Sequence, residues 1–561
     1  MNRAPRPHRT TAPDGTVLPH GTTLPRPAAR RRPRPRRLPR AAAVLTGLAL
    51  LAPAAAGTAR ADVGTISFSN DRTAWDRDEP ALSPAEVGKS DFGVRFSTPL
   101  DGQVFAQPLV IGPTVVVATE TNHVYGIAAG TGKITWHRQM GPAWASAAIG
   151  CSDPGPNVGT TSTPVYDPAT GTVYLTSKVD DGPDDKHPHY YVHAVDAQTG
   201  AERSGWPVTV QGDPVNAPGK PFNAYRSLQR PGLLLLDGRL YFGFGSLCGI
   251  GDYIGTLAGL DTRTRKLTLF STVAGSDTQR ASIWMAGSGL VSDGPGRFFL
   301  TTANGQGAGA SPAAGPGDRP PGGLGESVIR FAVDEDGGFA PVDFFSPSNN
   351  ATLDKRDTDL GSGGPVALPS TFGTPAHPRL LVQVGKDGRI FLLDRDDLGG
   401  MGQGPGGTDK VVGLTGPHGG VWGHPAVWGG DGGYVYTVEN FGKLRALRYS
   451  VDAAGTPKLS SAGTSAEDFL KMSGSPVVTS DGTRSGSALV WVIWSGTGQY
   501  GEGGELRAYD PVPVDGVLRL RRSFPLGTVS KFSVPATDKG RIYVGTKDHH
   551  LVALGRPGSF A

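Results

Sequence analysis

The sequence predicts an all-β protein, an eight-bladed β-propeller closed by an N-terminal strand that joins the C-terminal blade. Three observations support this fold. The 561-residue chain holds 83 Gly and 48 Pro, far more turn-forming residue than long helices tolerate. Short runs rich in Val, Ile, Tyr and Trp alternate with these turns, as in antiparallel strands. A four-strand pattern recurs along the chain, which is the signature of a repeat architecture.

The first repeat shows the unit most clearly. Its expected strands are AQPLVIG, TVVVATE, HVYGIA and KITWHRQ, at residues 106–112, 114–120, 123–128 and 133–139. Further copies occupy 162–200 and 231–261 and begin near Trp284, Gly361, Trp422 and Ser473. Each copy predicts one blade, a small antiparallel sheet.

The eighth copy, at 533–555, contains three strands and needs a fourth from elsewhere. The segment FGVRFSTPLDG at 92–102 has the pattern of a fourth strand that lacks the other three. Pairing the two would close the ring and remove exposed sheet edges. We therefore expect three parts: a signal peptide at 1–61, an N-terminal segment with the closing strand at 62–99, and the propeller at 100–561.

Residues 1–61 have the pattern of a secretory signal peptide. The basic run RRRPRPRRLPR at 30–40 precedes the apolar run AAAVLTGLALLAPAAAG at 41–57 and then Ala59-Arg60-Ala61, a small-x-small cleavage site. The apolar run is shorter than the ~20 residues of a membrane span. We expect a secreted or cell-surface protein that begins at Asp62 and has no membrane span; the alternative is an uncleaved anchor. Arg36-Arg37-Leu38 leaves both general and twin-arginine export open.

The charge of the chain is divided unevenly. Residues 1–61 hold twelve Arg and one Asp, a net charge of +11, which leaves −7 for the rest because the whole chain carries +4. The body has no basic stripe, so we expect no nucleic-acid partner and no anionic membrane surface as a partner.

Cys151 and Cys248 are the two cysteines of the chain. They exclude a multi-disulfide scaffold, a four-cysteine zinc site and a CxxCH haem attachment. With the first strand of each blade innermost, the loops from fourth to first strands and from second to third strands open on one face. Cys151 lies in a loop of the first kind and Cys248 in a loop of the second, which predicts a disulfide in an oxidising compartment. The alternative is two buried free thiols.

The repeat ending Ala194-Val195-Asp196-Ala197-Gln198-Thr199-Gly200 resembles the pyrroloquinoline-quinone (PQQ) type repeat, and this resemblance covers nearly all of the mature chain. It implies the fold of quinoprotein alcohol dehydrogenases, which hold PQQ and Ca²⁺ at the ring centre and use an Asp as base. The same repeats also build cofactor-free binding propellers, so the resemblance alone does not define an activity.

The resemblance implies roles for five residues. Asn304 matches a residue that supplies a metal oxygen. Asp357 is the closest match to the catalytic Asp beside the metal, and Asp359 is the next. Lys386 matches the cation that bonds the quinone oxygens, and Trp284 is a candidate for the flat residue on which the cofactor stacks. Each also has a structural explanation, because Asn-Gly and Lys-Asp-Gly are ordinary turns and charged loops are normally solvated.

Three positions depart from the family pattern. The vicinal Cys-Cys-Asp of the family appears as Cys151-Ser152-Asp153, with Asp153 kept as a cofactor-binding candidate although no Arg follows it. The metal-binding Glu falls near Ile250, where Asp252 is the nearest acid and becomes the third metal candidate. A site with fewer carboxylates binds Ca²⁺ more weakly.

Two classes of function follow. One is an exported oxidoreductase that oxidises an alcohol or sugar with PQQ and Ca²⁺, with a separate electron acceptor because no haem motif is present. The other is a non-catalytic secreted or cell-surface propeller that binds protein or glycan. Both place a small-molecule or glycan ligand at the central channel.

Overall fold

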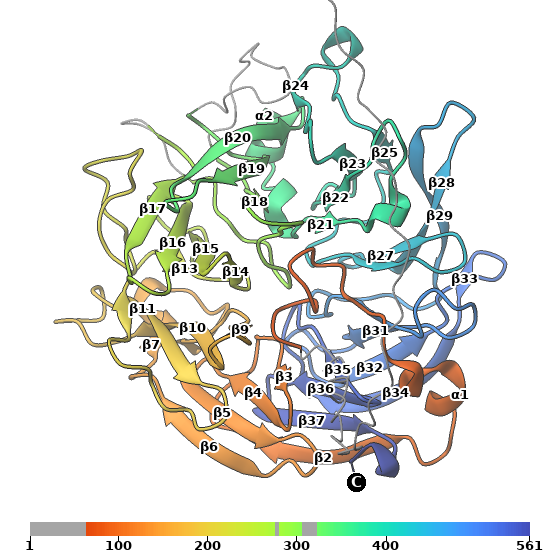
Figure 1. Ribbon diagram of the computed structural model, residues 1–561, viewed down its shortest axis with the longest axis horizontal. Coiled ribbons are helices and arrows are strands. Elements are labelled where there is room, and N and C mark those ends of the chain that lie inside the picture. The colour runs from red at the N-terminus through yellow and green to blue at the C-terminus, as the bar shows by residue number, and fades with distance from the viewer. Residues whose placement is uncertain (1–62, 275–279, 306–321, 561) are drawn as a thin grey trace, which may run out of the picture. The chain divides into compact units, whose positions relative to one another are not determined.

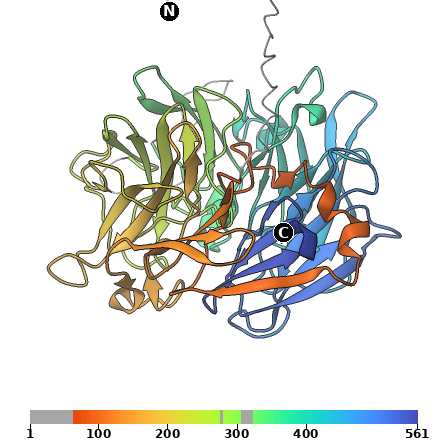
Figure 2. The ribbon, with the colours of Figure 1, turned by 60° about the horizontal axis from the view of Figure 1, so that its bottom comes forward.

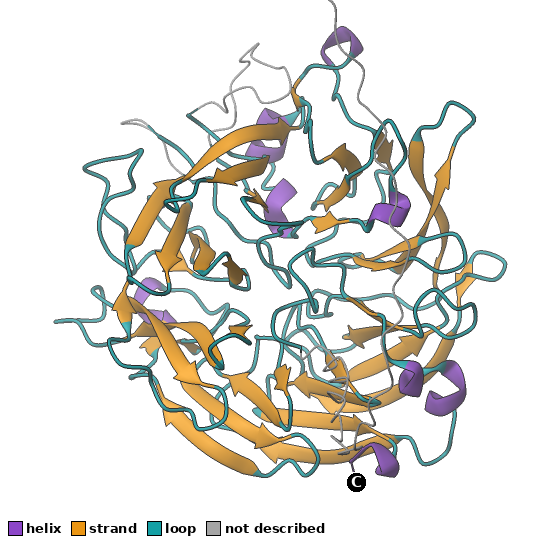
Figure 3. Cartoon of the chain, viewed as in Figure 1, coloured by secondary structure: helices purple, strands orange, loops and turns teal. Residues whose placement is uncertain are grey.

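Small sheets arranged around a ring make up the protein (Figure 1). The computed structural model describes residues 63–274, 280–305 and 322–560, which belong to one unit spanning 60–561. In these residues the chain forms eight sheets of four or five strands and one two-stranded sheet, with short helices between them (Figure 3). The all-β, eight-bladed prediction is therefore confirmed. The predicted signal peptide, 1–61, lies outside the described residues.

The strands of each blade follow one another outward from the ring centre. Blade 1 contains β3 (Leu109–Ile111), β4 (Thr114–Ala118), β5 (His123–Ala128) and β6 (Ile134–Gln139), and blade 2 contains β9 (Val165–Asp167), β10 (Thr172–Val179), β11 (His189–Asp196) and β12 (Val208–Thr209). Blade 3 contains β14 (Leu234–Leu236), β15 (Arg239–Ser246), β16 (Thr256–Asp261) and β17 (Leu267–Ser271). Blade 4 contains β18 (Arg297–Thr301), β19 (Val328–Val333) and β20 (Phe339–Ser346). Blade 5 contains β21 (Val366–Ala367), β22 (Leu380–Val384), β23 (Ile390–Asp394) and β25 (Gly413–Thr415), and blade 6 contains β26 (Ala426–Trp428), β27 (Tyr434–Val438), β28 (Leu444–Val451) and β29 (Pro457–Ser465). Blade 7 contains β30 (Val477–Thr479), β31 (Leu489–Trp494), β32 (Gly504–Tyr509) and β34 (Leu520–Gly527). Blade 8 contains β35 (Ala536–Asp538), β36 (Arg541–Gly545), β37 (His550–Gly555) and β2 (Gly93–Pro99).

Shorter elements surround this frame. The remaining strands are β1 (Trp75–Asp76) beside β30, β13 (Ser227–Leu228) beside β15, β24 (Gly400–Met401) beside β20, β33 (Val517–Leu518) beside β29, and the hairpin of β7 (Trp144–Ala145) and β8 (Asn157–Val158). The helices are α1 (Pro84–Val87) and α2 (Asn350–Lys355), with 3₁₀ turns at Pro80–Leu82, Ser146–Ile149, Leu360–Ser362, Ser370–Phe372, Pro405–Gly407 and Pro557–Phe560. None of the helices in the described residues could span a membrane.

Burial explains why inner and outer strands differ in sequence. Every residue of β4 and of β10 is buried, and β4 reads as a near-continuous apolar run, TVVVA. By contrast, β34 alternates between exposed and less exposed positions over most of its length. Inner strands are covered on both faces by neighbouring blades, whereas outer strands meet solvent on one side, so only the outer ones show the period of two.

The repeated Asp-x-x-Thr-Gly ending is a turn with a clear physical basis. The carboxylate of Asp196 accepts hydrogen bonds from the backbone N–H and the hydroxyl of Thr199, each at 2.9 Å. Gly200 follows with φ of 69°, a left-handed conformation that glycine adopts without steric cost. Asp261 makes the corresponding bond to the N–H of Thr264 at 2.7 Å in blade 3. The side chain thus fixes the turn from third to fourth strand.

The N-terminal strand β2 supplies the outer strand of blade 8. It pairs antiparallel with β37, from Gly93 opposite Gly555 to Pro99 opposite His550. Figure 2 shows the orange N-terminal strand beside the blue C-terminal strands. The predicted pairing is therefore present.

The residues before β2 form a channel segment, 63–79, that the sequence did not reveal. This segment crosses the inner edge of every blade (Figure 1). From blade 1 to blade 8 the hydrogen bonds are Val110 N to Val63 O, Tyr166 N to Gly64 O, Asn70 Nδ2 to Leu235 O, Ser292 N to Asn70 O, Ala367 N to Asp71 O, Val427 N to Thr73 O, Val478 N to Ala74 O, and Thr537 Oγ1 to Asp76 Oδ2.

Arg72 holds the channel segment in place. Its side chain is fully buried, and its guanidinium donates to the carbonyls of Leu290 at 2.9 Å and Leu233 at 3.1 Å and to the hydroxyl of Thr65 at 2.6 Å. Two further bonds reach carbonyls of the segment itself. The charge is therefore solvated by backbone dipoles in place of water.

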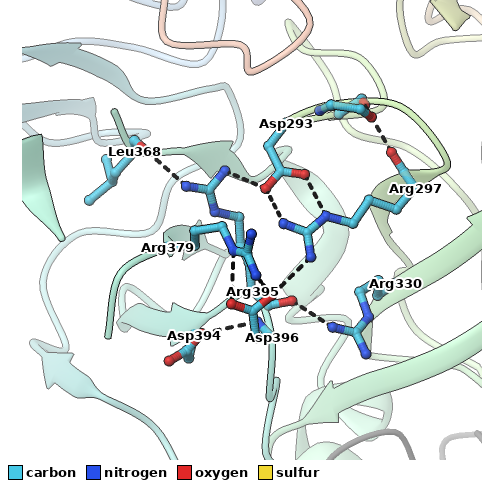
Figure 4. A network of polar contacts seen from close by, with 10 residues as sticks. Asp293, Arg297, Arg330, Leu368, Arg379, Asp394, Arg395 and Asp396 are labelled. Carbon is cyan, nitrogen blue, oxygen red and sulfur yellow. Dashed lines mark hydrogen bonds and ion pairs between the residues drawn. The ribbon is translucent and has the colours of Figure 1, made fainter. Parts of the chain in front are cut away.

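A charged network joins blades 4 and 5 (Figure 4). Arg297 pairs with Asp293 at 2.5 Å and with Asp396 at 2.9 Å. Arg395 also binds Asp293, at 2.8 Å, and Arg379 binds Asp396 at 2.7 Å. Because each carboxylate is shared by two guanidinium groups from different strands or loops, the network fixes the two blades to each other.

Candidate functional site

A cavity of about 250 Å³ lies among loops that join second to third and fourth to first strands. Its lining comes from blades 3 to 8 and includes Cys248, so this is the face on which the sequence places both cysteines. The volume is near the lower end of the range for small-molecule sites, about 300 to 1,000 Å³. We call this space the central cavity.

Four of the predicted site residues meet at one wall of the central cavity. The ammonium of Lys386 lies 2.5 Å from Asp359 Oδ2 and 3.3 Å from Asp357 Oδ2, and it donates to the Asp357 carbonyl at 3.2 Å. Asn304 donates from Nδ2 to Asp357 Oδ1 at 2.9 Å and from its backbone N–H to Asp359 Oδ1 at 3.0 Å. Residues more than 80 positions apart in sequence thus form one polar cluster, here called the acid–lysine cluster.

The two carboxylates of this cluster differ in exposure. The Asp357 side chain is 76% exposed, and the Asp359 side chain is 8% exposed. Asp357 also has φ of 52°, an uncommon backbone conformation outside glycine that is concentrated at functional sites. Asp357 is therefore the carboxylate that a ligand in the cavity can reach, whereas Asp359 is a buried anchor for Lys386. Burial opposes the charge of Lys386, but Asp359 and then Asp357 outweigh it and raise the pKa of Lys386 above its ordinary value.

Aromatic side chains form the apolar part of the wall. Trp284 lines the cavity as predicted and packs against the buried group around Trp144 and Cys151. The sequence interpretation missed Trp422 and Phe532, which also line the cavity. Trp422 lies 5.3 Å from the Lys386 ammonium, measured to the ring centroid. A signal for Trp422 existed, because it begins the sixth repeat as Trp284 begins the fourth.

Two lysines from blades 7 and 8 form a second polar wall, and both were missed. Lys471 and Lys531 line the central cavity. Asp153 pairs with Lys531 and lies 3.7 Å from the Lys471 ammonium, while it lines a neighbouring cavity of about 280 Å³. Burial opposes the charge of Asp153, but Lys531 outweighs it and lowers the pKa of Asp153. Asp153, predicted as a cofactor-binding residue, thus contacts the two lysines that line the central cavity and does not itself line that cavity.

The predicted disulfide is present. Cys151 and Cys248 are bonded, with their Cα atoms 5.9 Å apart and 97 positions between them in sequence. Cys248 lines the central cavity, so the bond ties the loop before blade 2 to the cavity wall in blade 3.

Asp252 does not join the other predicted metal ligands. It is exposed and lines a separate cavity of about 290 Å³ with Asn223 and Arg226. The next residue, Tyr253, lines both cavities. The turn therefore presents a phenol to the central cavity at the place where the sequence suggested a carboxylate.

A buried glutamate, Glu326, lies behind the acid–lysine cluster. Its Oε2 accepts a hydrogen bond from the backbone N–H of Leu360 at 2.6 Å, and its Oε1 has no hydrogen-bond partner among the described residues. Burial raises the pKa of Glu326 to about 9. Glu326 is therefore protonated at neutral pH and leaves Asp359 as the charged partner of Lys386.

The residues present do not fit a Ca²⁺ ion. Calcium takes six to eight oxygen ligands, and within the described part of the chain no group of three or more His, Cys, Asp or Glu is arranged to hold a metal. The charges of Asp357 and Asp359 are already balanced in part by Lys386, whose ammonium lies between them. A planar anionic quinone fits better, because indole faces and lysine ammonium groups line the same space.

Fold and cavity together define a class: an eight-bladed propeller of PQQ-type repeats with a cavity on the face that carries the disulfide. The family model PQQ_2, described as outer membrane protein assembly factor BamB, matches residues 85–218. A search of curated proteins finds no match.

Solved structures of dehydrogenases share the fold. The chain is similar to quinohemoprotein alcohol dehydrogenase ADHIIG from Pseudomonas putida HK5, with a TM-score of 0.60 and 15% identity over 89% of this chain and 81% of that one. The enzyme from Comamonas testosteroni gives 0.59 and 16% over 90% and 82%. A europium-containing methanol dehydrogenase gives 0.55 and 15% over 87% and 91%. At these identities the likeness shows the fold, the PQQ-type β-propeller.

Proposed function

We propose that the central cavity binds a quinone cofactor of the PQQ type and that the exported protein oxidises an alcohol or sugar. The observation that carries this proposal is the meeting of Trp284, Asn304, Asp357 and Lys386 in one cavity. All four match positions of the quinoprotein alcohol dehydrogenase pattern, in the same order along the chain. The shared fold with such enzymes supports the same reading.

The chain's own residues then have distinct tasks. Trp284 and Trp422 offer flat surfaces to a planar ligand, and the Lys386 ammonium is positioned to polarise a carbonyl oxygen. Asp357 is exposed and is held by hydrogen bonds from Asn304 and Lys386, so it is the base that takes the hydroxyl proton of the substrate. A bound quinone supplies a two-electron acceptor.

The decisive experiment is a titration of the purified protein with PQQ, in Ca²⁺ and in EDTA, followed by melting temperature and quinone absorbance. Cofactor at 100 times its dissociation constant should stabilise the fold by about 2.7 kcal/mol. We expect binding in both conditions, because Lys386 occupies the place between the carboxylates. No shift at saturating PQQ would remove the proposal.

Turnover is tested with an artificial electron acceptor. Asp357→Asn should lose at least about 10²-fold in rate, the lower range for a general base, and should still bind PQQ. Asp354→Asn is the matched control, since Asp354 lies three positions earlier in α2, does not line the cavity and pairs with Arg280 at 3.7 Å. Equal rates in the two variants would show that the loop is structural.

A non-catalytic propeller that binds protein or glycan is the second candidate. The observation that favours it is the neighbouring cavity beside Asp153, which is lined by Phe441 and Tyr500 with exposed fractions of 67% and 59%. Exposed aromatic faces next to lysines are suited to sugar rings and polar partners. Glycan binding without any PQQ binding would favour this candidate.

A further inference from the structure

Two ammonium groups of the central cavity share one carboxylate oxygen. Lys531 and Lys471 both approach Oδ2 of Asp153, Lys471 at 3.7 Å. The Lys531 side chain is 15% exposed and that of Lys471 is 43% exposed. Both lysines line the central cavity, whereas Asp153 lines the neighbouring one. The cavity therefore faces the cations and not their shared anion.

A third cation adds to this wall. Arg230 is buried and donates from its guanidinium to the backbone carbonyl of Lys531 at 3.1 Å. The other acid that interacts with Arg230 is Glu120, which is buried and has its pKa raised to about 7 by burial. Three cations thus share one fully charged carboxylate and one that is only partly charged at neutral pH.

We infer that the Lys471–Lys531 wall is a carboxylate-binding subsite of the central cavity. Buried positive charge is costly unless an anion compensates it. The mostly buried Lys531 lines the central cavity, and Lys471 lines both this cavity and the neighbouring one. Phe532 and Trp422 line the cavity together with these lysines, so the subsite suits a carboxylate on a flat ring. The acid–lysine cluster on the other wall is left for an uncharged oxygen of the same ligand.

The electrostatics of Lys531 make the subsite sensitive to pH. Burial, together with the positive charges of Arg230 and Lys471, lowers the pKa of Lys531 to about 8 against the opposing effect of Asp153. A bound carboxylate adds a second anion and must hold the proton more tightly. Affinity is therefore full below about pH 8 and falls as the pH rises above that value.

The first test uses isophthalate, a flat dicarboxylate that is not a quinone, titrated by calorimetry between pH 6.5 and 9.5. Its dissociation constant should rise by about tenfold per pH unit above pH ~8. Lys531→Gln should bind at least about tenfold more weakly at pH 7 with a flat profile, and Lys531→Arg should bind well up to pH 9.5. Lys547→Gln is the control, because Lys547 lines only the neighbouring cavity.

Two results would overturn the subsite: no isophthalate binding by the wild-type protein, or equal affinity and the same pH profile in Lys531→Gln. Neither result depends on the proposed function, since the probe transfers no electrons. If isophthalate binds only when Lys531 is present and the protein does not bind PQQ, the carboxylate-binding subsite is supported and the proposed PQQ function is rejected.

The carboxylate can belong to the cofactor or to an acidic substrate, and two further titrations distinguish these sources. PQQ carries three carboxylates, so a cofactor source predicts that PQQ binds at least about tenfold better than its trimethyl ester and that Lys531→Gln removes the difference. A substrate source predicts that the PQQ-loaded protein prefers glucuronate to glucose, again only with Lys531 present. Preference for neither charged ligand would overturn the subsite while leaving the proposed function intact.

Discussion

Replacing Lys386 by Met should lower the stability of the protein, because Lys386 is the cation of the acid–lysine cluster. The variant keeps the length of the side chain and removes the ammonium that binds both Asp357 and Asp359. Asp357 is 76% exposed, and losing an exposed ion pair costs about 0 to 1 kcal/mol. The Asp359 side chain is 8% exposed, and among the described residues it keeps only the Asn304 N–H as a hydrogen-bond donor. Removing one partner of a buried pair costs about 3–5 kcal/mol, so we expect a loss of about 3 kcal/mol at pH 7.5.

The size of this loss should depend on pH. In the wild-type protein the pKa of Lys386 is raised above 10.5, so its contribution is complete below that pH and is lost only as the pH rises above the folded value. In Lys386→Met the stranded Asp359 carboxylate can be relieved by a proton at low pH. The difference between the two proteins should therefore shrink to about 1 kcal/mol at pH 4.5 and grow towards pH 7.5.

Urea unfolding followed by tryptophan fluorescence at both pH values measures these differences. The double variant Lys386→Met/Asp359→Asn should recover most of the loss, because no buried charge remains. Lys355→Met, at an exposed position of α2, should stay within about 0.5 kcal/mol of the wild type. A loss of equal size at pH 4.5 and 7.5, or a double variant no more stable than Lys386→Met, would refute the reasoning.

Three further predictions concern stability. Replacing Cys151 and Cys248 by Ser opens a loop of 97 positions and should cost up to about 4.7 kcal/mol on a chain-entropy basis; reductant should lower the melting temperature of the wild type to that of the variant and leave the variant unchanged. Arg72→Met should cost about 3 kcal/mol, because five acceptors, four of them in buried hydrogen bonds, lose their donor. By contrast Arg77→Met, at an exposed position of the same segment, should cost less than about 0.5 kcal/mol; equal melting temperatures would contradict this. Burial raises the pKa of Glu326 to about 9, so the contribution of protonated Glu326 to stability is complete below pH ~4.5 and is lost as the pH rises to about 9. Glu326→Gln should therefore flatten the dependence of melting temperature on pH between about 4.5 and 9.

The blades could be predicted because their signals are local. A buried inner strand, a turn fixed by its own Asp and Thr, and an outer strand of period two each need fewer than ten residues. The acid–lysine cluster was also predictable, although its members are far apart in sequence. Asn304, Asp357 and Lys386 match the quinoprotein pattern in order along the chain, and the repeat topology places all three in loops on the same face.

The channel segment and the lysine wall gave no such signal. Apart from the two-residue strand β1, residues 63–79 have no strand pattern, since their hydrogen bonds are spread over eight different blades. Asp153 and Lys531 are 378 positions apart, and either residue alone has the composition of an ordinary polar loop. Asp252 was selected as the nearest acid to an expected position, but a shift of one residue in a turn decides which side chain enters a cavity, and there Tyr253 does.

Hydrogen-bond capacity couples ligand binding at Lys386 to the role proposed for Asp357. An ammonium has three N–H donors, and in this structure Lys386 contacts three oxygens: Asp357 O, Asp357 Oδ2 and Asp359 Oδ2. A ligand oxygen that binds Lys386 must therefore displace one of them. Asp359 is buried and Asp357 is exposed, so the bond to Asp357 Oδ2 is the cheapest to give up. The carboxylate released in this way keeps its hydrogen bond from Asn304 and has one oxygen free beside the ligand, which is where a base for an alcohol hydroxyl must stand.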